Sequence, residues 1–320
     1  MQDTLDIGID VAKAELVIGV AGRPEHDCTV ANTPTEIARW LTRVPPGARL
    51  AVESTGVYHR LLVTLAQARG LTVFVLNARD VHYYAKALGQ RGKTDRTDAQ
   101  VISRYLREHH PQLHPFVAGE PTQQRIDLLL QRRERVIVHQ DALRRSLQEL
   151  DDLQTVGPLL QALQALLAEI DQQMAALIAS QEHLARTTRL LRTIPGIGPL
   201  GSALLACLFQ RIAFARADAL VAFSGLDPRP MDSGQKRGRR RLSKRGSPLV
   251  RRTLFMAAFS ASRSLAFKTC YQALKARGLA TTEALVILAR KLLRIAFAVW
   301  KTQTAFDPRR YEEKNACAEL

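Results

Sequence analysis

The stretch TLDIGIDVAKAELVIGVAG, residues 4–22, decides the fold of the first part of this chain. It contains two β-rich runs, TLDIGIDVA and ELVIGVAG, that are separated by only a few residues, which predicts a β-hairpin. Asp10 lies at the end of the first run, where an unpaired charge among apolar neighbours is costly. The stretch therefore predicts two neighbouring strands and marks one acidic position that requires a charged partner.

Strand-like and helix-like segments alternate through the next ninety or so residues. DCTVAN is a candidate third strand, and ARLAVEST and LTVFVLN are further strands. Helical patterns lie between them in EIARWLTRV and VYHRLLVTLAQARG. A hairpin followed by alternating β and α segments predicts a mixed sheet covered by helices, so we expect an α/β domain over residues 1–115.

The pattern changes after this domain. Leu, Ile and Val recur at intervals of three and four from about residue 122 to 188, with charged residues and Gln between them. Gly157-Pro158 interrupts the run, so we expect two long helices that fold back as a hairpin. The heptads are imperfect, and residues 116–188 are interpreted as a coiled-coil arm that needs a partner to bury its apolar stripe.

Residues 189–305 are predicted to form a mostly helical domain, followed by a flexible tail over residues 306–320. The turn Pro195-Gly196-Ile197-Gly198 lies between two apolar helices. Such a turn exposes backbone amides that hold a DNA phosphate in helix-hairpin-helix modules. The alternative is a plain helix connection with glycine at the cap.

The charge of the chain is large and unevenly distributed. The 320 residues have a net charge of +16 and a pI of about 10.3, which favours a polyanionic partner. Residues 1–110 hold fourteen Lys and Arg against twelve Asp and Glu, a net of +2, whereas residues 229–252 hold ten against one, a net of +9. We therefore expect an acidic site in the front domain and a polyanion-binding loop in the rear domain.

The sequence predicts a cytoplasmic protein with no membrane partner. No apolar run reaches about 18 residues, the length of a transmembrane helix. The first twenty residues contain four acidic side chains and do not resemble a signal peptide. The four cysteines are far apart and lack the spacing of a zinc site, so we interpret them as reduced and structural.

Four carboxylates are the candidate catalytic and metal-binding residues. Asp10 and Glu53 lie at the ends of two predicted strands, and Asp95 and Asp98 open a helical stretch on one helix face. Carboxylate oxygens suit Mg²⁺, and two such ions stabilise the attacking and leaving oxygens in a phosphoryl displacement. Alternatively, Asp95 and Asp98 are helix N-terminal acids favoured by the dipole. The set as a whole predicts a site for two Mg²⁺ ions, or for Mn²⁺ in their place.

The second candidate site is the loop PRPMDSGQKRGRRRLSKRGSPLVRR, residues 228–252. Ser233 precedes a glycine, and a serine beside a metal-bound phosphate attacks it to form a phosphoserine intermediate. Local features alone leave Ser224, Ser243 and Ser247 as equal candidates. The predicted nucleic-acid contacts are the basic residues of this loop and the two glycines of the earlier turn: Lys236, Arg237, Arg239, Arg240, Arg241, Lys244, Arg245, Arg251, Arg252, Gly196 and Gly198.

Together these motifs resemble the DEDD transposases of the IS110 insertion-sequence family, which is related to the Piv-type DNA invertases. GIDVAK, AVESTG and KTDRTDA are similar to the RuvC-like, RNase-H-like domain of that family. IPGIG, AFSGLDPRPMDSG and SKRGSPLVRRTL are similar to its transposase domain. The resemblance covers nearly the whole chain, in the same order and spacing.

The resemblance implies specific roles. Asp10, Glu53, Asp95 and Asp98 become the metal-binding tetrad, and Ser233 becomes the nucleophile that links covalently to DNA. Family members cut and rejoin donor and target DNA under the guidance of a bridge RNA, and they assemble as dimers that pair into tetramers. The RuvC-like domain of one protomer then works with the serine domain of another, and the arm becomes the dimerisation element. The arginine-rich loop departs from the family pattern, so its DNA and RNA roles are hard to separate.

Three alternatives remain open at this point. A metal-dependent junction resolvase would use water as its nucleophile and Ser233 as a structural residue. A Piv-like site-specific invertase would work without RNA. A nucleic-acid-binding protein without enzymatic activity would be favoured if one of the four acids were absent, but all four are present.

Overall fold

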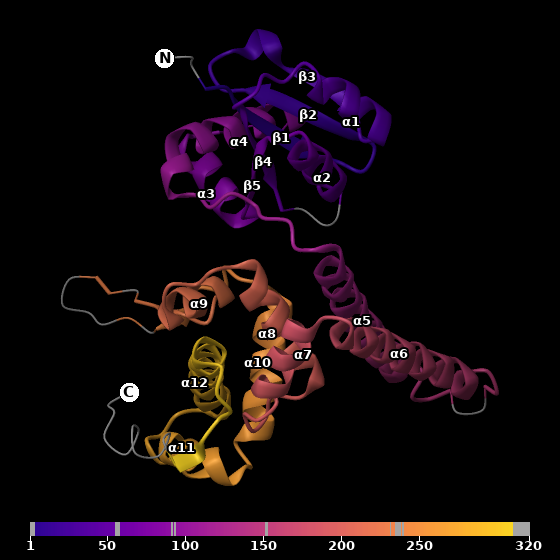
Figure 1. Cartoon of the computed structure of the whole chain (residues 1–320), viewed down its shortest axis with the longest axis vertical. Helices are drawn as coiled ribbons and strands as arrows, with labels where there is room; N and C mark the ends of the chain where they lie inside the picture. The colour runs from indigo at the N-terminus through magenta and orange to yellow at the C-terminus, as the bar shows by residue number, and fades with distance from the viewer. Residues whose placement is uncertain are drawn as a thin grey trace. The chain divides into compact units, whose positions relative to one another are not determined.

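The computed structural model describes residues 4–54, 58–90, 92, 94–150, 153–230, 232–233, 238 and 240–309. The chain divides into two units, Met1–Ala118 and Gly119–Leu320, which appear in Figure 1 in indigo to purple and in purple to yellow. Each unit has hydrophobic clusters of its own, so each is described separately below.

The first unit is built on a five-stranded mixed sheet with the order β3-β2-β1-β4-β5. Strand β2 is antiparallel to both of its neighbours, β1 and β3, whereas β4 is parallel to both of its neighbours, β1 and β5. The predicted hairpin, the third strand and the mixed α/β architecture are therefore confirmed. The strands are β1 (Asp6–Val11), β2 (Glu15–Val20), β3 (Cys28–Ala31), β4 (Arg49–Glu53) and β5 (Thr72–Leu76).

Helices cover both faces of this sheet (Figure 1). One face of β1, with Ile7 and Ile9, packs in a cluster with α1 and α2. The opposite face, which includes Ala51 and Phe74, packs on α3 and α4. Two covered faces explain why the strands are almost continuously apolar. The helical segments are η1 (Pro24–His26), α1 (Pro34–Leu41), α2 (Arg60–Ala68), α3 (Ala78–Ala87), α4 (Asp95–His109) and η2 (His110–Gln112).

The second unit is mostly helical and is centred on two apolar helices. Nine consecutive residues of α8, from Gly201 to Phe209, are buried, and α12 contributes eight further buried residues. The elements are α5 (Pro121–Ser146), α6 (Val156–Ala179), α7 (Glu182–Leu191), α8 (Pro199–Arg211), α9 (Ala217–Ser224), β6 (Pro228–Arg229), β7 (Arg241–Leu242), α10 (Pro248–Ala261), α11 (Leu265–Ala276) and α12 (Thr281–Thr302). This mostly α architecture agrees with the prediction for the rear of the chain.

The predicted pair of long helices is present as α5 and α6, which pack on each other. Arg133 of α5 makes a two-pronged ion pair with Asp171 of α6, with N–O distances of 2.6 and 3.0 Å. The predicted break at Gly157-Pro158 was wrong, because both residues lie in the first turn of α6. Proline is tolerated there since the first amides of a helix lack intrahelical partners. The second helix also ends at Ala179, and α7 follows as a separate helix.

No helix in the described part of the chain is long and apolar enough to cross a membrane.

Candidate active site and nucleic-acid-binding loop

Strand register brings Asp10 and Glu53 to neighbouring positions. The parallel pairing of β1 with β4 matches Ile9 with Val52, and Asp10 and Glu53 are the next residue on each strand. Side chains alternate between the two faces of a sheet. Both acids therefore belong to the same face as Gly8, at the carboxyl ends of the two strands.

That face is the one covered by α4. A Cβ atom at Gly8 would lie 2.2 Å from the Ser103 nitrogen and 2.3 Å from the Ala99 oxygen, so the helix backbone rests directly on this strand. A Cβ atom at Gly22, which follows the end of β2 beside the start of β1, would meet Arg107 at 2.9 Å. Helix α4 therefore runs antiparallel to β1, and its N-terminus lies toward Asp10.

The first turn of α4 carries the other two acids. Thr94 caps the helix in a reciprocal capping box with Thr97, and Asp95 and Asp98 lie in the first turn. Acidic side chains are stabilised there by the helix dipole. The fold thus brings all four predicted carboxylates to the same end of the same sheet face.

The described residues do not form a preassembled metal centre. Within the described ranges of the chain, no group of three or more His, Cys, Asp or Glu side chains is arranged to hold a metal ion. The four acids fit a divalent metal by chemistry and by location, because Mg²⁺ prefers hard oxygen ligands and retains several waters. Bringing four like charges together without a cation is costly, so an open arrangement is expected for the side chains alone.

Ser233 lies in an excursion of the chain between two short paired strands. Strand β6 is antiparallel to β7, with Arg229 paired to Arg241 in the register. Ser233 is exposed. Its neighbour Asp232 accepts hydrogen bonds from Arg240 at 2.8 Å and from the Gly238 amide at 3.0 Å. The hydrogen bond from Arg240, with help from that amide, lowers the pKa of Asp232.

The base of this loop is held tightly against the end of α9. The amide of Ser243 donates to the Asp227 carbonyl at 2.9 Å, and the Ser243 hydroxyl donates to the Asp227 carboxylate. Gly225 ends α9 in the left-handed region with a φ of 71°. A Cβ atom at Gly246 would lie 2.1 Å from the Phe223 carbonyl oxygen. The segments around residues 225 and 246 are therefore pressed together, backbone on backbone.

Sequence reasoning missed this role of Asp227, Gly225 and Gly246. The AFSGLDP and SKRG motifs pointed to the segments, but no periodicity pairs residues that are sixteen or more positions apart. Ser243, one of the alternative nucleophiles, is buried and hydrogen bonded to Asp227. Ser224 is fully buried and donates to the Val221 carbonyl at 2.7 Å. Of the four candidate nucleophiles, Ser233 and Ser247 are therefore favoured, because their side chains are exposed.

The residues predicted to contact phosphate differ in their exposure and in the contacts that their side chains make. Lys236, Arg237 and Arg239 lie outside the described residues. Arg252 pairs with Glu134 of α5, and Arg251 donates to the Gly246 carbonyl. Burial lowers the pKa of Arg251. The remaining basic side chains of the loop are exposed: Arg240, Arg241, Lys244 and Arg245.

The Pro195–Gly198 turn contains two different glycines. Gly196 has a φ of 92°, and a Cβ atom there would lie 2.3 Å from the Ala257 carbonyl oxygen of α10. Gly198 is the N-cap residue of α8, is exposed, and has open space around it. Gly196 therefore permits close helix packing, while the amide end of α8 at Gly198 is accessible to an anion.

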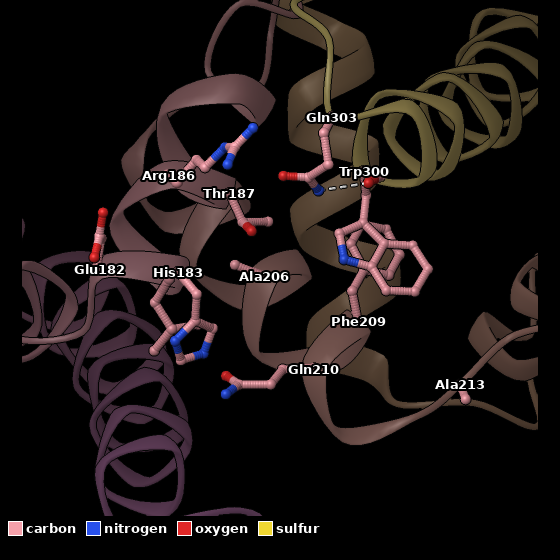
Figure 2. Close-up of a pocket in the computed structure, with 11 residues that line it drawn as sticks. Glu182, His183, Arg186, Thr187, Ala206, Phe209, Gln210, Ala213, Trp300 and Gln303 are labelled. Carbon is pink, nitrogen blue, oxygen red and sulfur yellow. Dashed lines mark hydrogen bonds between the residues drawn. The ribbon is translucent and has the colours of Figure 1, made fainter.

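The second unit also holds a cavity of about 710 Å³ between α7, α8 and the end of α12, shown in Figure 2. Trp300 stacks on Phe209 with 4.9 Å between ring centroids. The Gln210 side-chain oxygen is buried and has no hydrogen-bond partner among the described residues. The Gln303 amide donates to the Trp300 carbonyl at 2.6 Å. The volume is typical of ligand pockets, but none of the predicted site residues lines it.

Comparison with known proteins places these features in a family. A DEDD transposase family of the IS110 type, described as "Transposase", matches residues 7–158. The "Transposase IS116/IS110/IS902 family" matches residues 188–272. These ranges include the four acids and Ser233, respectively.

Several relatives are similar along almost their entire length. The pilin gene-inverting proteins of Moraxella bovis and Moraxella lacunata are each 28% identical over 320 residues, covering 96% of this chain and 98% of the relative. An uncharacterized 42 kDa protein of insertion element IS900 from Mycobacterium paratuberculosis is 24% identical, covering 90% of this chain and 96% of that protein. With both halves of the chain matched, the protein belongs to the IS110 family of DEDD transposases.

Proposed function

We propose that this protein cuts and rejoins DNA as the recombinase of an insertion sequence, with Ser233 as the nucleophile and the four acids as its metal-binding residues. The observation that carries the proposal is the register of β1 and β4, which places Asp10 and Glu53 side by side facing the helix that begins with Asp95. The exposure of Ser233 in a basic loop supports the second part.

The proposed reaction is a phosphoryl transfer in two steps. The Ser233 Oγ attacks a DNA phosphorus, an Oγ–P bond forms, and the bond from phosphorus to one sugar oxygen breaks. The serine proton leaves to solvent or to a carboxylate, and the departing sugar oxygen takes up a proton. A sugar hydroxyl of another strand then attacks the phosphoserine and releases the serine. Mg²⁺ or Mn²⁺, bound by the four carboxylates, would supply Lewis-acid stabilisation of the charge on the phosphate oxygens.

The chain's own residues contribute position and charge. Asp232, the residue before the proposed nucleophile, forms an ion pair with Arg240 on the other side of the loop. The hydrogen bond from Ser243 to Asp227 holds the base of the loop. Arg241, Lys244 and Arg245 are exposed and would contribute positive charge toward strand phosphates. These contacts orient the serine and the strand without reading base sequence.

We further propose that assembly completes the site. The acids lie in one unit and the serine in the other, and we assign the two parts of each active site to different protomers of a dimer that pairs into a tetramer. Exposed apolar side chains on the arm support a dimer contact: Val138, Leu143, Leu159 and Leu166 are 36–45% exposed. An unpartnered apolar stripe of this kind is usually covered by another chain.

Guidance by a bridge RNA that pairs with donor and target DNA is part of the proposal. The strongly basic loop, with its net of +9 over residues 229–252, supports binding of more than one polyanion. A second candidate function is inversion of DNA without RNA. The similarity to the two pilin gene-inverting proteins over 96% of the chain favours that candidate.

The test is trapping of a covalent protein–DNA adduct on a denaturing gel. Wild type, Ser233→Ala and the control Ser247→Ala are incubated with Mg²⁺ and donor and target DNA, with and without the RNA encoded beside the gene. Ser247 is a matched control because it is exposed and its side chain makes no helix-capping hydrogen bond.

An adduct in wild type and Ser247→Ala, but not in Ser233→Ala, is the expected result. Cleavage by all three proteins without any adduct would contradict the serine mechanism and leave a metal nuclease that uses water. An adduct that forms equally well without RNA would favour the invertase candidate. Asp10→Asn should remove cleavage while RNA binding remains.

A further inference from the structure

From a groove on the outer side of α4 we infer a binding site for one unstacked nucleotide, with adenine as the preferred base. The site adds a contact to the function proposed above. It rests on that function only for the assumption that the bound polymer is a DNA or RNA strand. None of the residues that form it belongs to the four acids or to the serine loop.

The groove lies in the first unit and has a volume of about 650 Å³, which is typical of small-ligand sites. It is bounded by the turn after β2, by the chain that follows α3, and by α4. Its apolar walls include Ala21, Pro24, Leu88 and Val101. These walls suit a base ring, and the polar groups described below suit its edge and its phosphate.

The polar group that points to a ligand is the side chain of Gln90. Both its Nε2 and its Oε1 are buried and have no hydrogen-bond partner in the described structure. A buried amide with neither atom paired is costly. Gln90 lines the groove, so a turn of its side chain toward the groove would bring the amide to a bound base. One donor and one acceptor in a rigid amide match adenine, whose N7 accepts and whose N6 amino group donates.

Three arginines lie along the same groove on α4: Arg96, Arg104 and Arg107. Arg107 is exposed, and its guanidinium makes no ion pair with any part of the chain that the structure describes. Arg96 and Arg104 use Nε to contact Asp27 at 3.3 Å and Glu108 at 2.8 Å. A guanidinium has five donors, so both retain N–H groups for a phosphate. With two acids and three arginines, the groove carries a net positive charge.

The groove is also held in shape by its own hydrogen bonds. Asp27 has a side chain only 5% exposed and accepts from the Val20 amide at 3.1 Å and from Gln100 at 2.6 Å. The Gln100 amide is therefore engaged, and Gln90 is the amide left to read a base. A site that is already organised loses less entropy when it binds.

Its location connects the groove to the proposed reaction. Arg96 directly follows Asp95, and Thr97 precedes Asp98, so the groove begins within the acidic first turn of α4. Arg104 and Arg107 lie two to three helical turns farther along α4. A strand whose nucleotide is held here would place a neighbouring phosphate toward the acids.

The test is binding to short oligonucleotides in EDTA, with the Ser233→Ala protein, so that cleavage plays no part. The probes are an 11-nucleotide oligo(dT) and the same strand with one central adenine, together with the corresponding RNA pair. We expect the adenine strand to bind about tenfold more tightly in at least one of the two series. The series that shows the preference identifies the polymer as DNA or RNA.

The controls change either the protein or the nucleotide at the proposed contact. Gln90→Leu should remove the adenine preference while oligo(dT) binding stays, and the exposed Gln112→Leu should keep the preference. Replacing the central adenine by 7-deazaadenine should weaken binding to the protein that retains Gln90, and this comparison does not depend on the folding of a Gln90 variant. The same replacement should not weaken binding to Gln90→Leu. Arg107→Gln should reduce the salt slope of binding by about 1, and Arg69→Gln should not.

No adenine preference in either series, or a preference that survives in Gln90→Leu, would overturn the inference. Because Ser233 and metal are absent from the assay, failure of the serine mechanism would leave this result unchanged. Conversely, if the protein that retains Gln90 showed no adenine preference while wild type still formed the covalent adduct, the nucleotide site alone would be refuted.

Discussion

Replacing Gly8 by alanine tests how the sheet positions the acidic turn of α4. The added Cβ atom would lie 2.2 Å from the Ser103 nitrogen and 2.3 Å from the Ala99 oxygen. Ordinary Cβ contacts begin near 3.4 Å, so the helix backbone must move by 3.4 − 2.2 = 1.2 Å. No flexible side chain can absorb this displacement, because both neighbouring atoms belong to the backbone.

The displacement has two measurable consequences. Overpacking of a core costs about 1–3 kcal/mol, and contact with backbone favours the upper end, which corresponds to a drop in melting temperature of roughly 10 °C for a unit of this size. A misplacement of about 1 Å at a catalytic group costs on the order of 100-fold in rate. Gly8→Ala should therefore lower both the stability of the first unit and the rate of DNA cleavage.

The assay combines calorimetric unfolding of the full chain with single-turnover cleavage. Gly201→Ala is the matched control, because a Cβ atom there would meet only the methyl carbons of Ile197 at 3.5 Å and Thr253 at 3.6 Å, which are ordinary contact distances, and the residue lies in α8. That change should leave stability unaltered or raise it by up to about 1 kcal/mol. Unchanged melting and cleavage in Gly8→Ala would refute the close contact of β1 with α4 and the position it implies for Asp95.

Three other predictions concern single contacts. Asp6 is 3% exposed and forms a two-pronged pair with Arg49 at 2.7 and 2.9 Å, so Asp6→Asn should destabilise the first unit by about 3 kcal/mol in denaturant unfolding. The pKa of Asp232 is lowered by Arg240, so this contact is present above the ordinary aspartate pKa and is lost as pH falls through the lower folded value. Arg240→Gln should shift the carboxyl titration upward in NMR, and an unmoved titration would contradict the pair. Gly246→Ala would place a Cβ atom 2.1 Å from a backbone carbonyl of α9 and should reduce adduct formation at the serine while the helical unit still unfolds cooperatively.

The sequence predicted more of the first unit than of the second. The runs ending at Asp10 and Glu53 are predicted as strands because apolar residues dominate them and several, such as Ile7, Ile9 and Val52, are β-branched, which is a local property of the chain. The helix beginning at Asp95 was marked in the sequence by its two acids, and the structure adds the capping threonine Thr94. The arm was less predictable. Gly157-Pro158 looks like a break, yet these residues fit the first turn of a helix, where proline removes no intrahelical hydrogen bond.

The candidate sites divide in the same way. Which residues could carry the chemistry was visible from charge and motif, as for Ser233 and the basic loop. Which of them are free was not visible, because Arg252 pairs with a glutamate 118 positions away. Likewise, Gly196 appeared to be a phosphate contact, whereas its Cβ position is filled by the carbonyl oxygen of Ala257. Such contacts join residues that no local pattern relates.

By itself the sequence determined the alternation of strands and helices, the four acids, the basic loop and the family to which the chain belongs. Only the tertiary structure decided that Asp10 and Glu53 share one sheet face and that α4 runs antiparallel to β1. It also decided that the side-chain amide of Gln90 is buried with no hydrogen-bond partner among the residues that the structure describes. The physical reason is that hydrophobic periodicity and capping act over a few residues. Strand register, helix direction and the satisfaction of buried polar groups depend instead on contacts between segments far apart in the chain.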